Sequence, residues 1–252
     1  MFFDGKQKLV EHIDHFLSNR DWYDSKGIPY SLGIGLHGPP GTGKTSCIKA
    51  IAKYTNRHII VISLKLIKTK KQLETFFFED RYSDDNSRNS IPFDKKIIVF
   101  EDIDCIGDIV KKRDPSVVTA AATTTTSLPD KWILAGKNTM DNQNQVHSSS
   151  TIGINSGSNG MVYKEPVTLD DFLNIWDGIR ETPGRIIIIT SNHYDQLDPA
   201  LTRPGRIDLT YEFKNVNHDV LQEMHQCFFG HKIPDSTVEK IVPYTLSPAE
   251  VV

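Results

Sequence analysis

The sequence predicts an α/β fold in which a parallel sheet is flanked by helices and followed by the start of a small helical lid. Outside residues 107–166, short apolar segments rich in β-branched residues alternate with segments of helical pattern. That alternation is typical of parallel strands joined by helical crossovers. A glycine-rich segment, GPPGTGKT, separates the first apolar segment from a helical one. From about residue 217 the pattern is helical and lacks strands.

The individual elements follow from hydrophobic periodicity. We expect strands at residues 34–36, 58–64, 96–100 and 185–191, and helices at about residues 6–19, 45–54, 66–78 and 168–178. The segment 58–64, HIIVISL, is a continuous β-branched run of the kind found in strands buried on both faces. The first helix carries an apolar stripe that includes Leu9, Ile13 and Phe16, so one of its faces is expected to be buried.

These elements divide the chain into four parts. Residues 1–106 and 167–216 are expected to form the two halves of one α/β core, and residues 217–252 a partial helical lid. Between them, residues 107–166 are rich in Ser, Thr, Asn and Gly. Too little of that segment is apolar to form a core, so we expect a largely disordered insertion that acts as a flexible linker.

Composition excludes several classes of protein. The 252 residues carry a net charge of −3 with a pI near 6.3, so no basic field indicates binding to nucleic acid. Three scattered cysteines form no metal-ligand spacing and favour a reducing compartment. No apolar run approaches the roughly 20 residues that a membrane-spanning helix needs. As written, the chain is expected to be cytoplasmic.

The segment GPPGTGKT matches the phosphate-binding loop pattern G-x-x-x-x-G-K-[ST]. Its glycines let the backbone turn so that several N–H groups point at a triphosphate. Lys44 then reaches the β- and γ-phosphates, the Thr45 hydroxyl binds Mg²⁺, and the following helix directs its positive end at the same anion. The predicted ATP-binding residues are Gly38, Pro39, Pro40, Gly41, Thr42, Gly43, Lys44 and Thr45.

Carboxylates follow the strand at residues 96–100, in the sequence IIVFEDID. In a parallel sheet, ligand chemistry gathers at the carboxyl ends of the strands. Glu101 and Asp102 are therefore predicted to supply a magnesium ligand and a base that orients the attacking water. Asp104 is expected to be a local cap or ion-pair partner. The simpler alternative is an acidic turn with no chemical role.

Two further groups are candidates for contact with the nucleotide phosphates or the lytic water. Asn192 follows the strand at residues 185–191 and can hold the lytic water or touch the γ-phosphate, although Asn after a strand is often only a turn residue. Arg203 and Arg206 flank Pro204 and Gly205, in a rigid turn expected to present both guanidiniums outward with no local acidic partner. That arrangement suits a phosphate on a neighbouring subunit. Ordinary surface ion pairs are the alternative.

GPPGTGKT, IIVFEDID, TSN and LDPALTRPGRID, in this order and spacing, resemble the AAA family of ATPases. EDIDC, TLDDFLNIWDGI and TLSPAEVV are similar to one clade of it, which contains the mitochondrial chaperone of complex III assembly and plant relatives. The resemblance implies that Glu101 is the metal-side carboxylate, Asp102 occupies the position of the catalytic Glu, and Asn192 is the first sensor. It also implies that Arg203 and Arg206 act in trans within a homo-oligomeric ring of six or seven subunits.

The chain departs from that clade in several respects. Ser31 and Leu32 stand where a basic pair is typical, and we expect no counterpart in these 252 residues of the clade's membrane helix or of the domain that follows it. The resemblance makes the mitochondrial inner membrane a possible location only if an N-terminal part is missing. Threading of an unfolded chain is not supported, because the aromatic–apolar–Gly tripeptide is lacking.

Two functions remain open at this point. The first is an ATP-hydrolysing ring that remodels or translocates a protein substrate. The second is a nucleotide-dependent assembly module with weak hydrolysis, since Asp102 is one methylene shorter than Glu. The roles of Trp22, Tyr23, Tyr30 and His37 are also open between packing and contact with the adenine.

Overall fold

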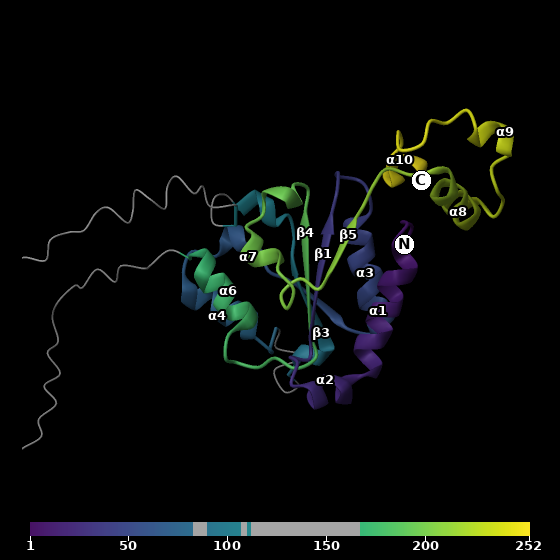
Figure 1. Cartoon of the computed structure of the whole chain (residues 1–252). Coiled ribbons are helices and arrows are strands. Elements are labelled where there is room, and N and C mark those ends of the chain that lie inside the picture. The colour runs from purple at the N-terminus through teal and green to yellow at the C-terminus, as the bar shows by residue number, and fades with distance from the viewer. Residues whose placement is uncertain (83–89, 107–109, 112–166) are drawn as a thin grey trace, which may run out of the picture. The chain divides into compact units, whose positions relative to one another are not determined.

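The computed structural model describes residues 1–82, 90–106, 110–111 and 167–252. Its centre is a five-stranded sheet with strand order β2-β3-β4-β1-β5, in which every pair of neighbours is parallel (Figure 1). The strands are β1 (Ser31–His37), β2 (His58–Val61), β3 (Lys96–Phe100), β4 (Arg185–Ser191) and β5 (Leu209–Glu212). The predicted α/β class is confirmed, with β3 and β4 at the expected residues.

Position in the sheet decides how deeply each strand is buried. All residues of β3 and β4 are buried, because these strands have neighbours on both sides and helices on both faces. The expectation that 58–64 forms a strand buried on both faces is wrong. β2 ends at Val61, lies at the edge of the sheet, and leaves Val61 54% exposed. The opposite edge, β5, was not predicted, because its four residues alternate between half-buried and exposed.

Helices cover both faces of the sheet (Figure 1). On one face α1 (Lys6–Ser18) and α3 (Lys44–Thr55) pack against Ile186 and Ile188 of β4. On the other face α4 (Lys70–Phe78) and α6 (Leu169–Asp177) pack against Ile187 and Ile189 of the same strand. Alternate side chains of a strand point to opposite faces, so β4 joins the two hydrophobic cores.

Shorter helical elements complete this part of the chain. They are α2 (Arg20–Lys26), α7 (Pro199–Thr202), and the 3₁₀ turns η1 (Leu64–Leu66), η3 (Phe93–Lys95), η4 (Ile103–Ile106) and η6 (Tyr194–Gln196). The helix predicted at 66–78 begins later, at Lys70. Thr69 caps it by accepting a hydrogen bond from the backbone N–H of Gln72.

The C-terminal residues form α8 (His218–Phe229), α9 (Asp235–Val238) and α10 (Pro248–Val251). Asn217 caps α8 through the backbone N–H of Val220. A small core forms here around Val216, Leu221 and Met224. The helical pattern beyond residue 217 is thus confirmed, and the role of this segment as a lid stays a prediction.

Most of the predicted insertion, residues 107–166, lies outside the described residues. The disorder expected for it stays a prediction. Val110 and Lys111 are described. Val110 is 1% exposed, and its carbonyl accepts a hydrogen bond of 2.8 Å from the backbone N–H of Asp198. Lys111 forms an isolated antiparallel bridge with Leu197. Val110 therefore belongs to the hydrophobic core, and Lys111 pairs with the same folded unit, although both lie inside the range predicted as insertion.

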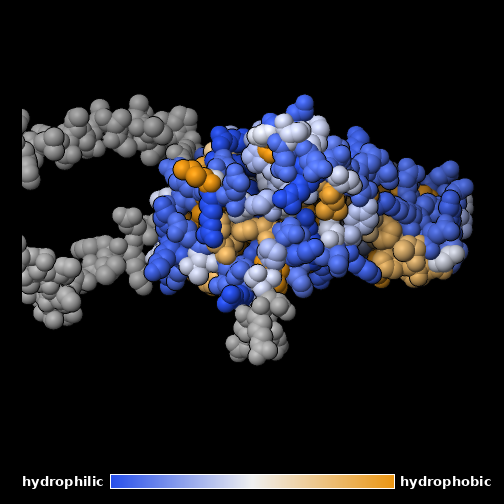
Figure 2. All heavy atoms as spheres, turned by 90° about the horizontal axis from the view of Figure 1, so that it is seen from below, coloured by the Kyte–Doolittle hydropathy of each residue, from blue (hydrophilic) through white to orange (hydrophobic). Residues whose placement is uncertain are grey.

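The face seen from below is largely hydrophilic, with separate hydrophobic patches (Figure 2). Among the described helices, none has the length and apolar character needed to cross a membrane.

Candidate nucleotide site at the carboxyl edge of the sheet

The phosphate loop connects the end of β1 to the start of α3. Gly38, Gly41 and Gly43 all have positive φ, at 137°, 79° and 98°. Residues with a Cβ rarely adopt such backbone conformations. Position 38 has a second constraint, because a Cβ there would lie 2.0 Å from the carbonyl oxygen of Phe213. The conformational role predicted for the three glycines is confirmed.

Lys44 is held over this loop. Its side chain is buried, and its ammonium group donates to the carbonyl oxygens of Gly38 at 2.6 Å and Pro39 at 2.9 Å. A third hydrogen bond, of 2.8 Å, goes to Oδ1 of Asn192. The Thr42 hydroxyl also donates to the Pro39 carbonyl, at 2.7 Å. The loop thus fixes a cation at its centre, linked directly to the end of β4.

Thr45 and Glu101 come together although 56 residues separate them. The Thr45 hydroxyl lies 3.4 Å from Oε1 of Glu101, and both residues are exposed. Oxygen ligands of this kind suit Mg²⁺, which usually keeps several waters and takes one or two protein ligands beside substrate phosphates. Within the described ranges, no three His, Cys, Asp or Glu residues form a metal-binding group. The Thr45 hydroxyl and the Glu101 carboxylate fit Mg²⁺ bound jointly with a nucleotide.

Asp102 and Asp104 occupy different environments beyond β3. Asp102 is exposed and adopts φ +45°, and its backbone N–H donates to the Thr190 hydroxyl at 2.8 Å. Asp104 is buried and accepts a hydrogen bond of 3.2 Å from the backbone N–H of Asn192. Burial lowers the pKa of Lys44, and the charges of Asp102 and Asp104 oppose that shift. Asp104 thus binds the backbone just beyond β4, 88 residues away, instead of acting as a local cap, and Asp102 is exposed to solvent.

The two arginines do not lie as expected. Arg206 is only 7% exposed, and it donates to Asp177 through Nε at 2.8 Å and Nη2 at 2.9 Å. It also donates to the carbonyl of Ala200. Nη2 of Arg203 donates to the same carboxylate at 2.6 Å, while its side chain stays 57% exposed. The expectation of two outward guanidiniums without an acidic partner is wrong, because the end of α6 places Asp177 between them.

Sequence reasoning missed Asp177. It lies 26 and 29 residues from its partners, and no local pattern links WDG to RPGR. Burial raises the pKa of the Asp177 carboxyl, but hydrogen bonds from Arg206 and Arg203 outweigh burial, so that its pKa lies below the ordinary value. The carboxylate therefore stays ionised and neutralises part of the charge of both arginines.

The C-terminal segment also reaches the phosphate loop. The backbone N–H of Ala249, in α10, lies 3.3 Å from the carbonyl oxygen of Gly41. The Ser247 hydroxyl would lie 3.5 Å from a Cβ at position 41. Ser247 and Glu250 form a capping box at the start of α10. That capping pattern can be found in the sequence, but its position beside the loop cannot.

Of the aromatic residues before β1, Tyr23 and Tyr30 pack against the core, whereas Trp22 is 45% exposed. Tyr30 stacks on Phe16 with ring centroids 4.5 Å apart, and Tyr23 contacts the same ring edge-on at 5.9 Å. His37 stacks on Tyr194 at 4.7 Å, and burial lowers the pKa of its imidazole. These contacts confirm the packing role for Tyr23, Tyr30 and His37. Contact of these residues with an adenine stays a prediction.

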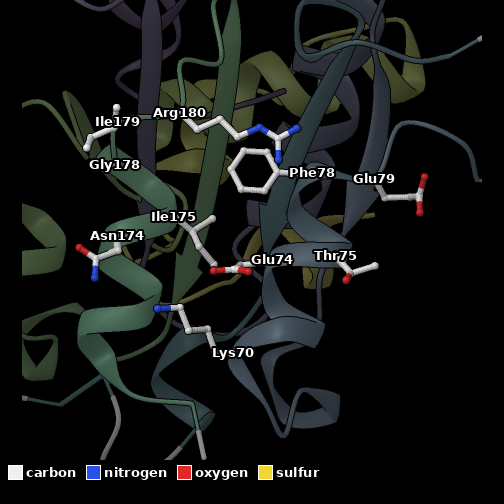
Figure 3. A pocket seen from close by; sticks show the side chains of 10 residues that line it. All are labelled: Lys70, Glu74, Thr75, Phe78, Glu79, Asn174, Ile175, Gly178, Ile179 and Arg180. Carbon is white, nitrogen blue, oxygen red and sulfur yellow. The ribbon is translucent and has the colours of Figure 1, made fainter. Parts of the chain in front are cut away.

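A separate open groove of about 660 Å³ lies between α4 and α6. Figure 3 shows Arg180 directed at the ring of Phe78, and the guanidinium carbon lies 3.8 Å from the ring centroid. None of the predicted site residues lines this groove. This groove is therefore distinct from the candidate nucleotide site.

The parallel sheet and the phosphate loop at its carboxyl edge define an α/β protein of the P-loop NTPase class. The pattern of the ATPase family associated with various cellular activities (AAA) matches residues 34–128 and 146–215. The chain belongs to this AAA family, as the motif resemblance predicts.

Relatives in the family include mitochondrial chaperones. The mitochondrial chaperone BCS1 of Homo sapiens is 29% identical over 97% of this chain and 47% of its own length. A probable mitochondrial chaperone of Schizosaccharomyces pombe is 28% identical over 98% of this chain and 43% of its own length. A putative AAA family ATPase of Acanthamoeba polyphaga mimivirus is 33% identical over 81% of this chain and 89% of its own length. The chain thus spans less than half the length of the two chaperones.

Proposed function

We propose that this chain binds Mg–ATP at the carboxyl edge of its sheet and hydrolyses it as a protein-remodelling or translocating ATPase. One observation carries the proposal: Lys44 is hydrogen-bonded to both the phosphate loop and Asn192. Residues from two neighbouring strands thereby meet where the terminal phosphates of a nucleotide belong. On nucleotide binding, Lys44 exchanges its carbonyl acceptors for phosphate oxygens.

The remaining roles follow from position and chemistry. Thr45 and Glu101 would hold Mg²⁺, which supplies charge neutralisation at the β- and γ-phosphates. Asp102 is the candidate base, because its carboxylate is exposed at the strand end while Asp104 is engaged. Asn192 orients the lytic water or contacts the γ-phosphate.

The two arginines take unequal parts in this proposal. Arg203 acts in trans on the nucleotide of a neighbouring subunit, since its side chain is 57% exposed and donates to a single carboxylate oxygen. Arg206 is buried and bonded to both oxygens of Asp177, which suits a residue that supports the turn. The family pattern assigns both arginines to the trans role. The geometry favours Arg203 as the one that reaches across a ring of six or seven subunits.

The chaperone role and location rest on the relatives. Two of them bear the name mitochondrial chaperone, so we propose a chaperone activity and a mitochondrial location for the protein that contains this chain. The substrate class is a protein.

A second candidate function is a nucleotide-dependent assembly module with slow turnover. Asp102 supports it, because this residue is shorter than Glu and has φ +45°. Such strain is found where the surrounding structure holds a residue in place, which limits how far the carboxylate can move toward the lytic water.

Steady-state ATPase activity measured against protein concentration, with sedimentation velocity on the same samples, tests the proposal. We expect activity to rise steeply as rings form, because Arg203 acts only between subunits. Tight ATP binding without turnover in fully assembled rings would favour the assembly module. Absence of ATP binding would contradict both functions.

A further inference from the structure

A second cavity, of about 380 Å³, lies at the opposite end of the sheet from the phosphate loop. It is bounded by the connection from α2 to β1 and the connection from α6 to β4, and Ser31, Thr182 and Arg185 line it. Ser31 and Arg185 are register partners in neighbouring parallel strands, so their side chains share one face of the sheet. The cavity thus brings together two hydroxyl groups and one guanidinium.

Among the residues that the structure describes, none accepts a hydrogen bond from Nε of Arg185. Its side chain is buried, with only 6% of the residue exposed, and no described residue accepts a hydrogen bond from the guanidinium. Nε is completely buried, and the Phe77 ring lies 5.9 Å from the guanidinium carbon. By contrast, the half-buried guanidinium of Arg57 donates hydrogen bonds to the carbonyl oxygens of Gly184 and Phe93. An unpaired buried charge is unfavourable, so Arg185 is left with donors to satisfy.

The nearest carboxylates are already engaged. Asp177 accepts its hydrogen bonds from Arg203 and Arg206. Asp208 accepts from the backbone N–H groups of Gly33 at 2.9 Å and Gly205 at 3.1 Å. Burial lowers the pKa of Arg185 to about 10, and the charges of Asp177 and Asp208 oppose the shift without contributing a hydrogen bond.

We propose that this cavity binds a small inorganic oxyanion, of the phosphate or sulfate type, on Arg185, Thr182 and Ser31. The planar fork of a guanidinium donates two parallel hydrogen bonds to an oxyanion. The Thr182 residue is 8% exposed, and no described residue is hydrogen-bonded to its hydroxyl or to that of Ser31. Since a liquid water occupies about 30 Å³, a cavity of this size holds an oxyanion with several waters.

Three carboxylates line the cavity: that of Asp177, which is bonded to Arg203 and Arg206, and those of Asp24 and Glu181. Asp24 lies 3.8 Å from Arg20, and Glu181 is exposed to solvent. Both charges are thereby weakened by a partner or by water, whereas Arg185 is buried and its Nε has no hydrogen-bond partner among the described residues. The proposed site is independent of ATP hydrolysis, because none of its three residues belongs to the phosphate loop.

The test compares thermal unfolding in phosphate or sulfate with unfolding in chloride at equal ionic strength. It uses the Lys44→Ala chain, so that the phosphate loop does not contribute, and repeats the comparison on the unmutated chain saturated with Mg–ADP. We expect phosphate to raise the midpoint when Arg185 is present and to have little effect on Arg185→Met. Without an oxyanion, Arg185→Met should be as stable as the parent or more stable, since it removes an unpaired buried charge.

Control variants separate this site from general salt effects. Arg180→Gln removes an exposed arginine that lines the same cavity but stacks on Phe78, and it should keep the full response. Ser31→Ala keeps the charge and should weaken the response. If phosphate raised the unfolding midpoint of Arg185→Met as much as that of the parent, the cause would be a general effect of excluded salts, and the proposal would be overturned. The proposal would also be overturned if phosphate raised the unfolding midpoint of neither the parent nor any variant. In that case water occupies the cavity.

One more outcome would contradict the oxyanion site. If Arg185→Met changes the sedimentation of the protein while phosphate has no effect, the partner of Arg185 is a group on a second copy of the chain. None of these measurements needs ATP turnover, so failure of the ATPase function leaves this test intact.

Discussion

Asp177 accepts two parallel hydrogen bonds from the guanidinium of Arg206, at 2.8 and 2.9 Å, and fixes that side chain below the protein surface. Bidentate pairs of this geometry are among the stronger hydrogen-bonded ion pairs. The same carboxylate holds the exposed Arg203 through one oxygen. The end of α6 therefore positions the turn that carries both arginines.

The first prediction concerns Asp177→Asn. The substitution keeps the shape of the side chain but removes its charge, and it leaves the buried guanidinium of Arg206 without its anion. We expect a loss of about 1.5–3 kcal/mol in the free energy of unfolding, the range for hydrogen bonds to charged groups. Urea denaturation measures it. Glu212→Gln, in the exposed pair with Lys214, is the matched control and should cost under about 1 kcal/mol.

The second prediction is the pH dependence of the difference in unfolding free energy between the parent and Asp177→Asn. Since the folded pKa of Asp177 lies below its unfolded value, the ionised carboxylate adds stability at and above the unfolded pKa of about 3.9. This contribution should be complete near neutral pH and disappear as the pH falls through the folded value. Unfolding free energies of parent and Asp177→Asn should thus converge in acid. A gap that persists at the lowest pH would contradict the assignment.

The third prediction concerns Lys44→Ala. The substitution removes the cation that links the phosphate loop to Asn192, so ATP affinity should be lost. Calorimetric titration with a nonhydrolysable ATP analogue measures the affinity. Lys53→Ala, in the last turn of the same helix, is the control and should bind normally. Unchanged affinity in Lys44→Ala would contradict the assignment of the phosphate loop.

The fourth prediction separates the two candidate functions through Asp102. Asp102→Asn should retain ATP binding and lower turnover by about 10²–10⁴-fold, the usual contribution of a general base. Asp102→Glu restores the length of the usual residue. A rise in turnover with Glu would support the slow assembly module as the native state. A variant Asp102→Asn that still turns over at the parent rate would place the base elsewhere.

The fifth prediction concerns Arg203→Ala in mixed assemblies. If Arg203 acts on a neighbouring nucleotide, each mutant subunit impairs an unmutated one, and activity falls more steeply than the mutant fraction. An arginine supplied in trans contributes about 10³–10⁵ in rate. Mixing experiments at constant total protein measure the curve. Activity that falls in simple proportion would contradict action in trans.

Much of the fold and the loop chemistry can be predicted from local sequence. Strands β3 and β4 appear as continuous apolar runs, because buried parallel strands leave no face for polar residues. The three loop glycines follow from backbone sterics alone. In contrast, β2 resembles a buried strand in sequence, and only its place at the edge of the sheet exposes Val61.

The sequence by itself determined the α/β class, the phosphate loop and the carboxylates that follow β3, because each depends on residues adjacent along the chain. Tertiary structure decided which distant groups meet: Lys44 with Asn192, Arg206 with Asp177, and Ser31 with Arg185 across the sheet. The physical reason is that strand order and helix packing set those distances. No periodicity in the sequence records which carboxylate will reach a given guanidinium, or which guanidinium will be left without one.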